Sequence, residues 1–222
     1  MYVPTSLNDI IFGNPESKLR IYDIVTGAET LPASGKSGIL LYGTWGTGKT
    51  TMATMLPDAI EKGRTQEELT MSADLIRCQQ GFNGPQVIDF IAKILDKNSL
   101  NASGLHYIII DEVDLLTKSA QESLKSAMNT SRCIFILTTN YIAYLDRGLL
   151  DRCVLVEMNA AAINDYLPLA KNLVSDMGVV MSDDDLLPTI SAAKGSLRNL
   201  IHNVKRMARR KNLTHLTLKE DI

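Results

Sequence analysis

A short glycine-rich run near the start of the chain has the spacing of a phosphate-binding loop. It follows an apolar stretch at 38–42 and consists of Gly43, Thr44, Trp45, Gly46, Thr47, Gly48, Lys49, Thr50 and Thr51. Glycines at this spacing let backbone N–H groups turn inward around phosphate oxygens, and the helix that follows directs its positive end at the same anion. Lys49 is expected to contact the β- and γ-phosphates, and the hydroxyl of Thr50 to bind the Mg²⁺ that bridges them.

Two carboxylates follow a second apolar run. Residues 105–110 have the composition of a buried strand in a parallel sheet, and Asp111 and Glu112 come directly after it. Open α/β sheets bind ligands at the carboxyl ends of their strands, so these acids should lie beside the phosphate loop. Asp111 is expected to hold the magnesium, directly or through water, and Glu112 to polarise the attacking water. The alternative is that the two acids cap a following helix.

Three further polar residues stand where they could read or stabilise a phosphate. Asn140 ends the run Thr138-Thr139-Asn140 and could hydrogen-bond the γ-phosphate, although it could instead cap the next turn. Arg152 follows a turn at a strand edge. Since Lys49 and magnesium fill the cleft, Arg152 is better placed to reach a neighbouring subunit's nucleotide, with a surface salt bridge as the alternative. Arg198 lies in the first turn of a helix, where a cation opposes the dipole, which predicts an anionic partner such as the γ-phosphate.

Strands and helices alternate along most of the chain. We predict strands at 38–42, 69–76, 105–110, 133–137 and 154–158, with helices at 16–26, 50–62, 87–95 and 118–128. This alternation is typical of a doubly wound α/β fold with a parallel five-stranded sheet. From Asn159 onward only helical segments follow, at 160–176, 183–193 and 196–211. The sequence therefore predicts a nucleotide-binding α/β domain at 1–158 and a small all-helical domain at 159–222.

Composition excludes several classes of protein. A net charge of −2 over 222 residues argues against a protein that coats nucleic acid by bulk charge. A basic cluster at 205–211 is either a solvated face or a contact for nucleic acid or an acidic partner. The three cysteines are widely spaced and indicate neither a disulfide framework nor a zinc site. Nothing resembles a signal peptide or a membrane span, so we expect a cytoplasmic protein with no membrane partner.

Two aromatic residues lie on predicted loops. Trp45 is unusual in a phosphate loop and could cover the nucleotide or touch a neighbouring subunit. Phe82 lies between Gly81 and Gly84, in a segment rich in turn residues. It is either a loop residue folded back on the core or a loop tip that faces a central channel or a nucleic-acid strand.

Taken together, the phosphate loop, Asp111-Glu112, Asn140 and a helical lid with Arg198 resemble the AAA+ ATPases, over almost the whole chain. Within them the chain is most similar to clamp-loader ATPase subunits of the replication factor C and phage type. The segment from Asp111 to Gln121 resembles that family's acidic box. Two shorter matches are Leu150-Asp151-Arg152-Cys153, at the place of the Ser-Arg-Cys motif, and Gly195-Ser196-Leu197-Arg198, which resembles the sensor-2 motif.

This resemblance implies an oligomer of AAA+ subunits that hydrolyses ATP with Mg²⁺ at subunit interfaces, acting in DNA replication on DNA and a sliding clamp. It implies that Arg152 is an arginine finger, that Arg198 contacts the nucleotide, and that Ile11 and Phe12 border the adenine. The chain departs from the family at Asp151, where a serine is usual. Clamp-loader subunits of this family have a collar domain after the lid, and the resemblance does not extend to such a domain after the segment 219–222. A second reading is a ring-forming remodeller that threads protein or single-stranded nucleic acid past Phe82, whose surroundings resemble an aromatic pore loop.

Overall fold

The chain forms two compact units. The computed structural model describes residue 4 and residues 6–220, with side chains as far as residue 211, so the end of the predicted helical domain at 221–222 lies outside the described residues. We name the units the α/β unit, with Asn14–Gly43 and Lys49–Met158, and the helical unit, with Met1–Gly13, Thr44–Gly48 and Asn159–Ile222. Residues 44–48 of the phosphate loop thus group with the C-terminal helices.

A five-stranded parallel sheet forms the centre of the α/β unit, which confirms the predicted fold class. The strand order is β2-β3-β4-β1-β5. The strands are β1 (Gly38–Tyr42), β2 (Asp74–Arg77), β3 (His106–Asp111), β4 (Cys133–Thr139) and β5 (Cys153–Glu157). Strands β3 and β4 are buried along their whole length, because helices cover both faces of a parallel sheet, and they are therefore almost continuously apolar.

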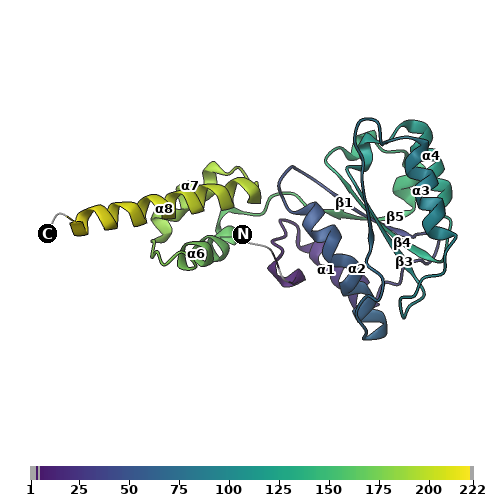
Figure 1. The fold of residues 1–222 in the computed structure, drawn as a ribbon, viewed down its shortest axis with the longest axis horizontal. Coiled ribbons are helices and arrows are strands. Elements are labelled where there is room, and N and C mark those ends of the chain that lie inside the picture. Colours follow the sequence, from purple (N-terminus) through teal and green to yellow (C-terminus); the bar gives the residue numbers. More distant parts are fainter. Residues whose placement is uncertain (1–3, 5, 221–222) are drawn as a thin grey trace. The chain divides into compact units, whose positions relative to one another are not determined.

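Helices pack on both faces of this sheet (Figure 1). On one face α1 (Pro15–Thr26) and α2 (Lys49–Thr65) lie side by side, and on the other α3 (Pro85–Leu95) and α4 (Lys118–Ala127) do so. The short α5 (Arg147–Asp151) precedes β5, and the 3-10 turns η2 (Val113–Leu115) and η3 (Ile142–Tyr144) follow β3 and β4. Helix α1 begins where the Asn14 side chain accepts the N–H of Glu16, and it ends at Gly27 in a left-handed conformation.

The second strand is shorter than the sequence predicts. We expected it at 69–76, and it occupies Asp74–Arg77. Strand β2 lies at the sheet edge and pairs with Ile108–Asp111 of β3, although β3 itself begins two residues earlier, at His106. The N–H of Met71 instead donates to Oδ1 of Asn101 at 2.9 Å. The backbone of Met71 is therefore bonded to the segment after α3 and not to β3.

The helical unit has its own hydrophobic core. Its elements are η1 (Leu7–Asp9), η4 (Ile163–Tyr166), α6 (Leu167–Ser175), α7 (Asp183–Ala192) and α8 (Leu197–Glu220). Buried residues of the last four pack together, among them Tyr166, Leu173, Leu186, Leu200 and Val204. The predicted helix at 160–176 begins later, at residue 167, because the carboxylate of Asp165 accepts the N–H of Ala162 and closes a separate 3-10 turn.

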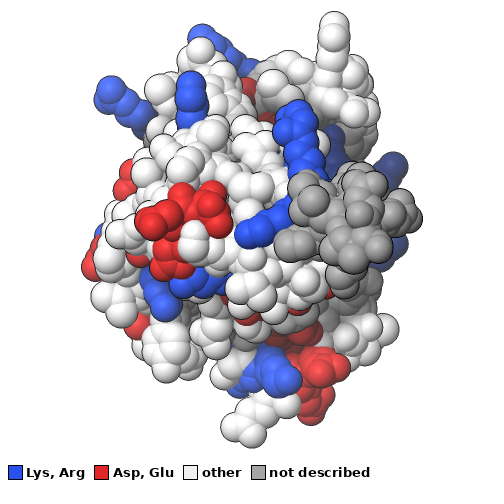
Figure 2. Space-filling view, turned by 90° about the vertical axis from the view of Figure 1, so that its left-hand side faces the viewer, with Lys and Arg blue, Asp and Glu red and all other residues white. Residues whose placement is uncertain are grey.

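The surface carries charges of both signs. Figure 2 shows Lys and Arg side chains together with Asp and Glu side chains on the face it presents. In the basic cluster at 205–211, Lys211 forms an ion pair with Asp185 at 3.9 Å and donates to the carbonyl of Val180. Among the described residues, no helix is both long enough and apolar enough to cross a membrane.

Candidate functional site

Strand β1 leads into the phosphate loop, and α2 leaves it. Gly46 and Gly48 have φ values of 75° and 98°, a region that glycine enters without steric strain. The Lys49 ammonium donates to the carbonyl of Gly43 at 2.9 Å, and the residue is only 7% exposed. Burial lowers the pKa of Lys49 to about 8, and the nearby carboxylates of Asp111, Asp114 and Glu112 oppose that shift. The sequence-predicted cation is thus held inside the loop, facing the predicted acids.

The carboxylate of Asp111 joins three elements of the α/β unit. Its Oδ1 accepts the hydroxyl of Thr50, from α2, at 2.8 Å and the hydroxyl of Thr138, from β4, at 2.6 Å. Thr50 and Asp111 were both predicted from the sequence as magnesium ligands. Their oxygens are of the type that Mg²⁺ prefers, and one or two protein ligands beside phosphate oxygens suffice for this ion. Among the described residues, no group of three or more His, Cys, Asp or Glu side chains could hold a metal ion by itself.

Glu112 has an unusual backbone conformation. Its φ of 58° and ψ of 49° are left-handed, which is uncommon for a residue other than glycine and is worth about 1–3 kcal/mol of strain. Its N–H donates to the hydroxyl of Thr138 at 3.1 Å, and its side chain is exposed. Glu112 makes no side-chain cap to η2, and the cap of α4 is Thr117. Neither Asp111 nor Glu112 therefore caps a helix with its side chain, which was the alternative role for these acids.

Thr138 is the residue that our sequence reasoning missed. Its hydroxyl donates to Asp111 and accepts from Glu112, so it fixes both acids at once. The sequence did contain a signal for this residue, because Thr138 belongs to the polar run 138–140, from which we chose Asn140 as the candidate. Asn140 is half-buried directly after β4. The hydroxyl of Thr139 accepts the N–H of Tyr141, and η3 has no side-chain cap, so the capping alternative for Asn140 is not found among the described residues.

Arg152 occupies the turn between α5 and β5. Its Nε donates to Oδ1 of Asn129 at 2.9 Å, and its Nη1 donates to the carbonyl of Gly148 at 2.8 Å. Both acceptors are neutral, and none of the ion pairs among the described residues includes Arg152. The salt bridge that we considered as the alternative is therefore not found there, and the guanidinium keeps its full charge for an anion.

The helical unit holds the remaining predicted residues. The carbonyl of Gly46 accepts the N–H of Leu197 at 2.8 Å, and the N–H of Thr44 donates to Oδ1 of Asn159 at 3.1 Å. These bonds tie residues 44–48 to the start of α8, where Arg198 is exposed. Trp45 is 59% exposed. Nearer the N-terminus, Ile11 and Phe12 are half-buried, and Ile11 packs against the core of this unit.

Phe82 does not project as a loop tip. It is half-buried and packs against the core of the α/β unit. Its N–H donates to the carbonyl of Gln79 at 2.8 Å, and Gln79 returns a hydrogen bond at 3.3 Å. This tight turn agrees with the reading of Phe82 as a loop residue folded back on the core.

Comparisons with known proteins agree on the family and the fold. A model of the ATPase family associated with various cellular activities (AAA) matches residues 39–159. Replication factor C small subunit 2 of Pyrobaculum islandicum is 25% identical over 90% of this chain and 60% of its own length. Human replication factor C subunit 5 is 26% identical over 90% of this chain and 57% of its own length. The chain therefore spans less than two thirds of these relatives.

Solved structures show a similar fold. The Holliday junction branch migration motor RuvB of Thermotoga maritima aligns with a TM-score of 0.70 at 21% identity, covering 96% of this chain and 67% of that protein. A DNA polymerase III gamma subunit-related protein of the same organism gives a TM-score of 0.57 at 16% identity, covering 85% of this chain and 57% of that protein. These findings confirm the resemblance to AAA+ ATPases and to replication factor C subunits.

Proposed function

Because this chain belongs to the AAA family of ATPases, we propose that it hydrolyses ATP with Mg²⁺ at an interface between subunits. Lys49 binds the β- and γ-phosphates, while Thr50 and Asp111 hold the magnesium, which neutralises charge on the transferred phosphoryl group when it is bound. Glu112 polarises the attacking water. Its exposed side chain and its backbone, fixed by Thr138, suit that role.

Other residues complete the proposed nucleotide site. Asn140 and Arg198 report the presence of the γ-phosphate, and Ile11 and Phe12 border the adenine. Residues 1–158 serve as the nucleotide-binding domain and residues 159–222 as a lid. In support of a role for this lid, the N–H of Leu197 donates to the carbonyl of Gly46, which connects the phosphate loop to the start of the helix that carries Arg198.

The strand register carries the proposal of a shared site. Cys153, which follows Arg152, is aligned with Gly38 at the start of β1, whereas the phosphate loop begins after Tyr42 at its end. Strand β1 has 5 residues, so its first and last residues lie roughly 13 Å apart at about 3.3 Å per residue. An arginine side chain does not span that length. Arg152 therefore acts on a nucleotide bound by another subunit, as an arginine finger.

We assign this ATPase to a clamp-loader-like role in DNA replication, with other AAA+ subunits, DNA and a sliding clamp as partners. The similarity to replication factor C subunits over 90% of the chain supports this assignment. Primed DNA should then stimulate ATP hydrolysis, and the stimulation should fall steeply with salt because phosphate contacts release counterions. Hydrolysis that DNA leaves unchanged at low salt would count against it. The alternative remodeller gains no support from Phe82, which packs on the core.

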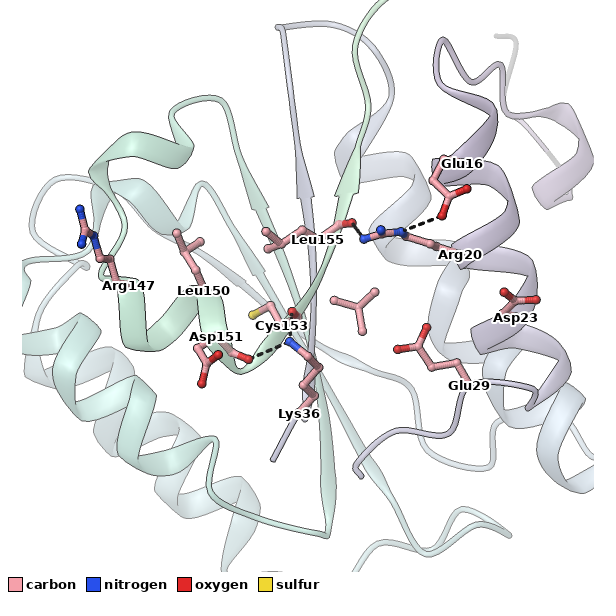
Figure 3. A pocket seen from close by; sticks show the side chains of 11 residues that line it. Glu16, Arg20, Asp23, Glu29, Lys36, Arg147, Leu150, Asp151, Cys153 and Leu155 are labelled. Carbon is pink, nitrogen blue, oxygen red and sulfur yellow. Dashed lines mark hydrogen bonds and ion pairs between the residues drawn. The ribbon is translucent and has the colours of Figure 1, made fainter. Parts of the chain in front are cut away.

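Replacement of Arg152 by alanine tests the shared site. In the assembled protein with primed DNA, kcat for ATP should fall on the order of a thousandfold while nucleotide binding is retained. Arg147→Ala is the matched control, because Arg147 is exposed at the start of the short helix that precedes Arg152 and its guanidinium points away from Asp151 in Figure 3. Equal turnover by the Arg152 variant and the control would remove the finger role.

A further inference from the structure

The backbone on either side of Arg152 is held by one lysine. The Lys36 ammonium donates to the carbonyl of Asp151 at 2.8 Å and to the carbonyl of Cys153 at 3.0 Å. Figure 3 shows this ammonium beside the backbone that enters β5. Lysine side chains at a sheet edge usually extend into solvent, where they keep other strands away. Here the side chain bridges the carbonyls of the two residues that flank Arg152.

The start of β1 holds the same turn and the end of α4 together. The carbonyl of Arg152 accepts the N–H of Ser37 at 3.1 Å and the N–H of Gly38 at 3.0 Å. The hydroxyl of Ser37 donates to the carbonyl of Met128 at 2.6 Å in a buried hydrogen bond. Asn129 is the next residue in the chain. The backbones of Arg152 and Asn129 are therefore both anchored to one dipeptide, which sets the distance between their side chains.

Two nitrogens of the Arg152 guanidinium are held by hydrogen bonds within the chain. Nε donates to Asn129 and Nη1 donates to the carbonyl of Gly148, while no hydrogen bond of Nη2 is found among the described residues. Two hydrogen bonds fix the plane of a guanidinium, since a single bond leaves it free to rotate. Neutral acceptors also preserve its positive charge, which a carboxylate at the same place would offset. Nη2 therefore has N–H groups left for a further acceptor.

We propose that Asn129 is a positioning residue for the arginine finger. It orients the Arg152 guanidinium before a second subunit's nucleotide binds. The arginine side chain then does not have to change rotamer before Nη2 contacts the γ-phosphate. This inference rests on the proposed function of Arg152. Asn129 itself is exposed and touches no reacting group, so it acts only through Arg152.

The experiment compares kcat and KM for ATP in the full-length protein with primed DNA. Asn129→Leu preserves the size of the side chain and removes the acceptor, and Asn129→Ala serves as a second variant. Both should lower kcat on the order of tenfold with KM unchanged, because misorientation of a catalytic group affects the chemical step. Asn98→Leu, which changes another exposed asparagine, should match the unmodified protein.

A double-mutant cycle separates positioning from general damage. In the Arg152→Ala background, Asn129→Leu should change kcat by less than about twofold, since the group that it orients is absent. Single-turnover measurement at high protein concentration makes that residual rate accessible. An unchanged kcat in the Asn129 variants, or the same loss with and without Arg152, would overturn the inference. A normal kcat for Arg152→Ala alone would instead refute the proposed function, so the two failures are distinguishable.

Discussion

Replacement of Thr138 by valine should affect both chemistry and stability. The side chain is 2% exposed, and valine has nearly the same shape, so no cavity is expected. Two hydrogen bonds are lost, one to the carboxylate of Asp111 at 2.6 Å and one from the N–H of Glu112 at 3.1 Å. That N–H is left without its partner in a left-handed backbone. An unmade bond of this kind costs about 1–3 kcal/mol.

We therefore expect Thr138→Val to lower the free energy of unfolding by about 2 kcal/mol. Loss of the fixed Glu112 backbone should also lower kcat for ATP by roughly ten- to a hundredfold, the equivalent of about 1.4–2.8 kcal/mol. Urea denaturation followed by fluorescence and steady-state ATP hydrolysis measure the two effects. Thr138→Ser, which loses the methyl group and retains the hydroxyl, is the control in which both hydrogen bonds can still form. If valine preserves both stability and turnover, Thr138 does not hold the acids in the way described.

Three further predictions concern the α/β unit. Gly63→Ala should destabilise the protein by roughly 1–3 kcal/mol, measured by thermal denaturation, because a Cβ there would overlap the carbonyl oxygen of Val25 where α2 meets α1. Gly84→Ala, with only a flexible side chain nearby, should change stability much less. Tyr107→Phe removes the hydroxyl that donates to the fully buried carboxylate of Glu61 at 2.8 Å, and should lower the unfolding free energy by about 1 kcal/mol in urea; an unchanged midpoint would contradict this. Burial raises the pKa of the Cys78 thiol to about 12, so iodoacetamide at pH 8 should alkylate it only after unfolding; rapid labelling of the native protein would show that the site opens.

Much of the fold and site could be predicted because local patterns encode them. Glycine spacing, the run of apolar residues before Asp111 and the alternation of helices with strands each follow from short stretches of sequence. The exact start of β2 could not be predicted, because the N–H of Met71 is bonded to Asn101, a residue 30 positions further along the chain.

Contacts between distant residues were also beyond sequence patterns. Thr138 meets Asp111 only because β4 lies next to β3, and sequence spacing does not state which polar residue of a strand end faces that neighbour. Asn129 carries no motif, and its bond to Arg152 depends on two turns anchored at the start of β1. Phe82 was ambiguous for a similar reason, since a loop sequence does not show whether the loop folds back.

The most direct test of a shared ATP site mixes two inactive variants of this chain. Glu112→Gln retains the finger but not the base, and Arg152→Ala retains the base but not the finger. If subunits associate head to tail, an equal mixture should recover up to about a quarter of the unmodified ATPase rate, because about one interface in four pairs an intact site with an intact finger. A mixture as inactive as its components, or full activity of Arg152→Ala alone, would contradict hydrolysis at an interface between subunits.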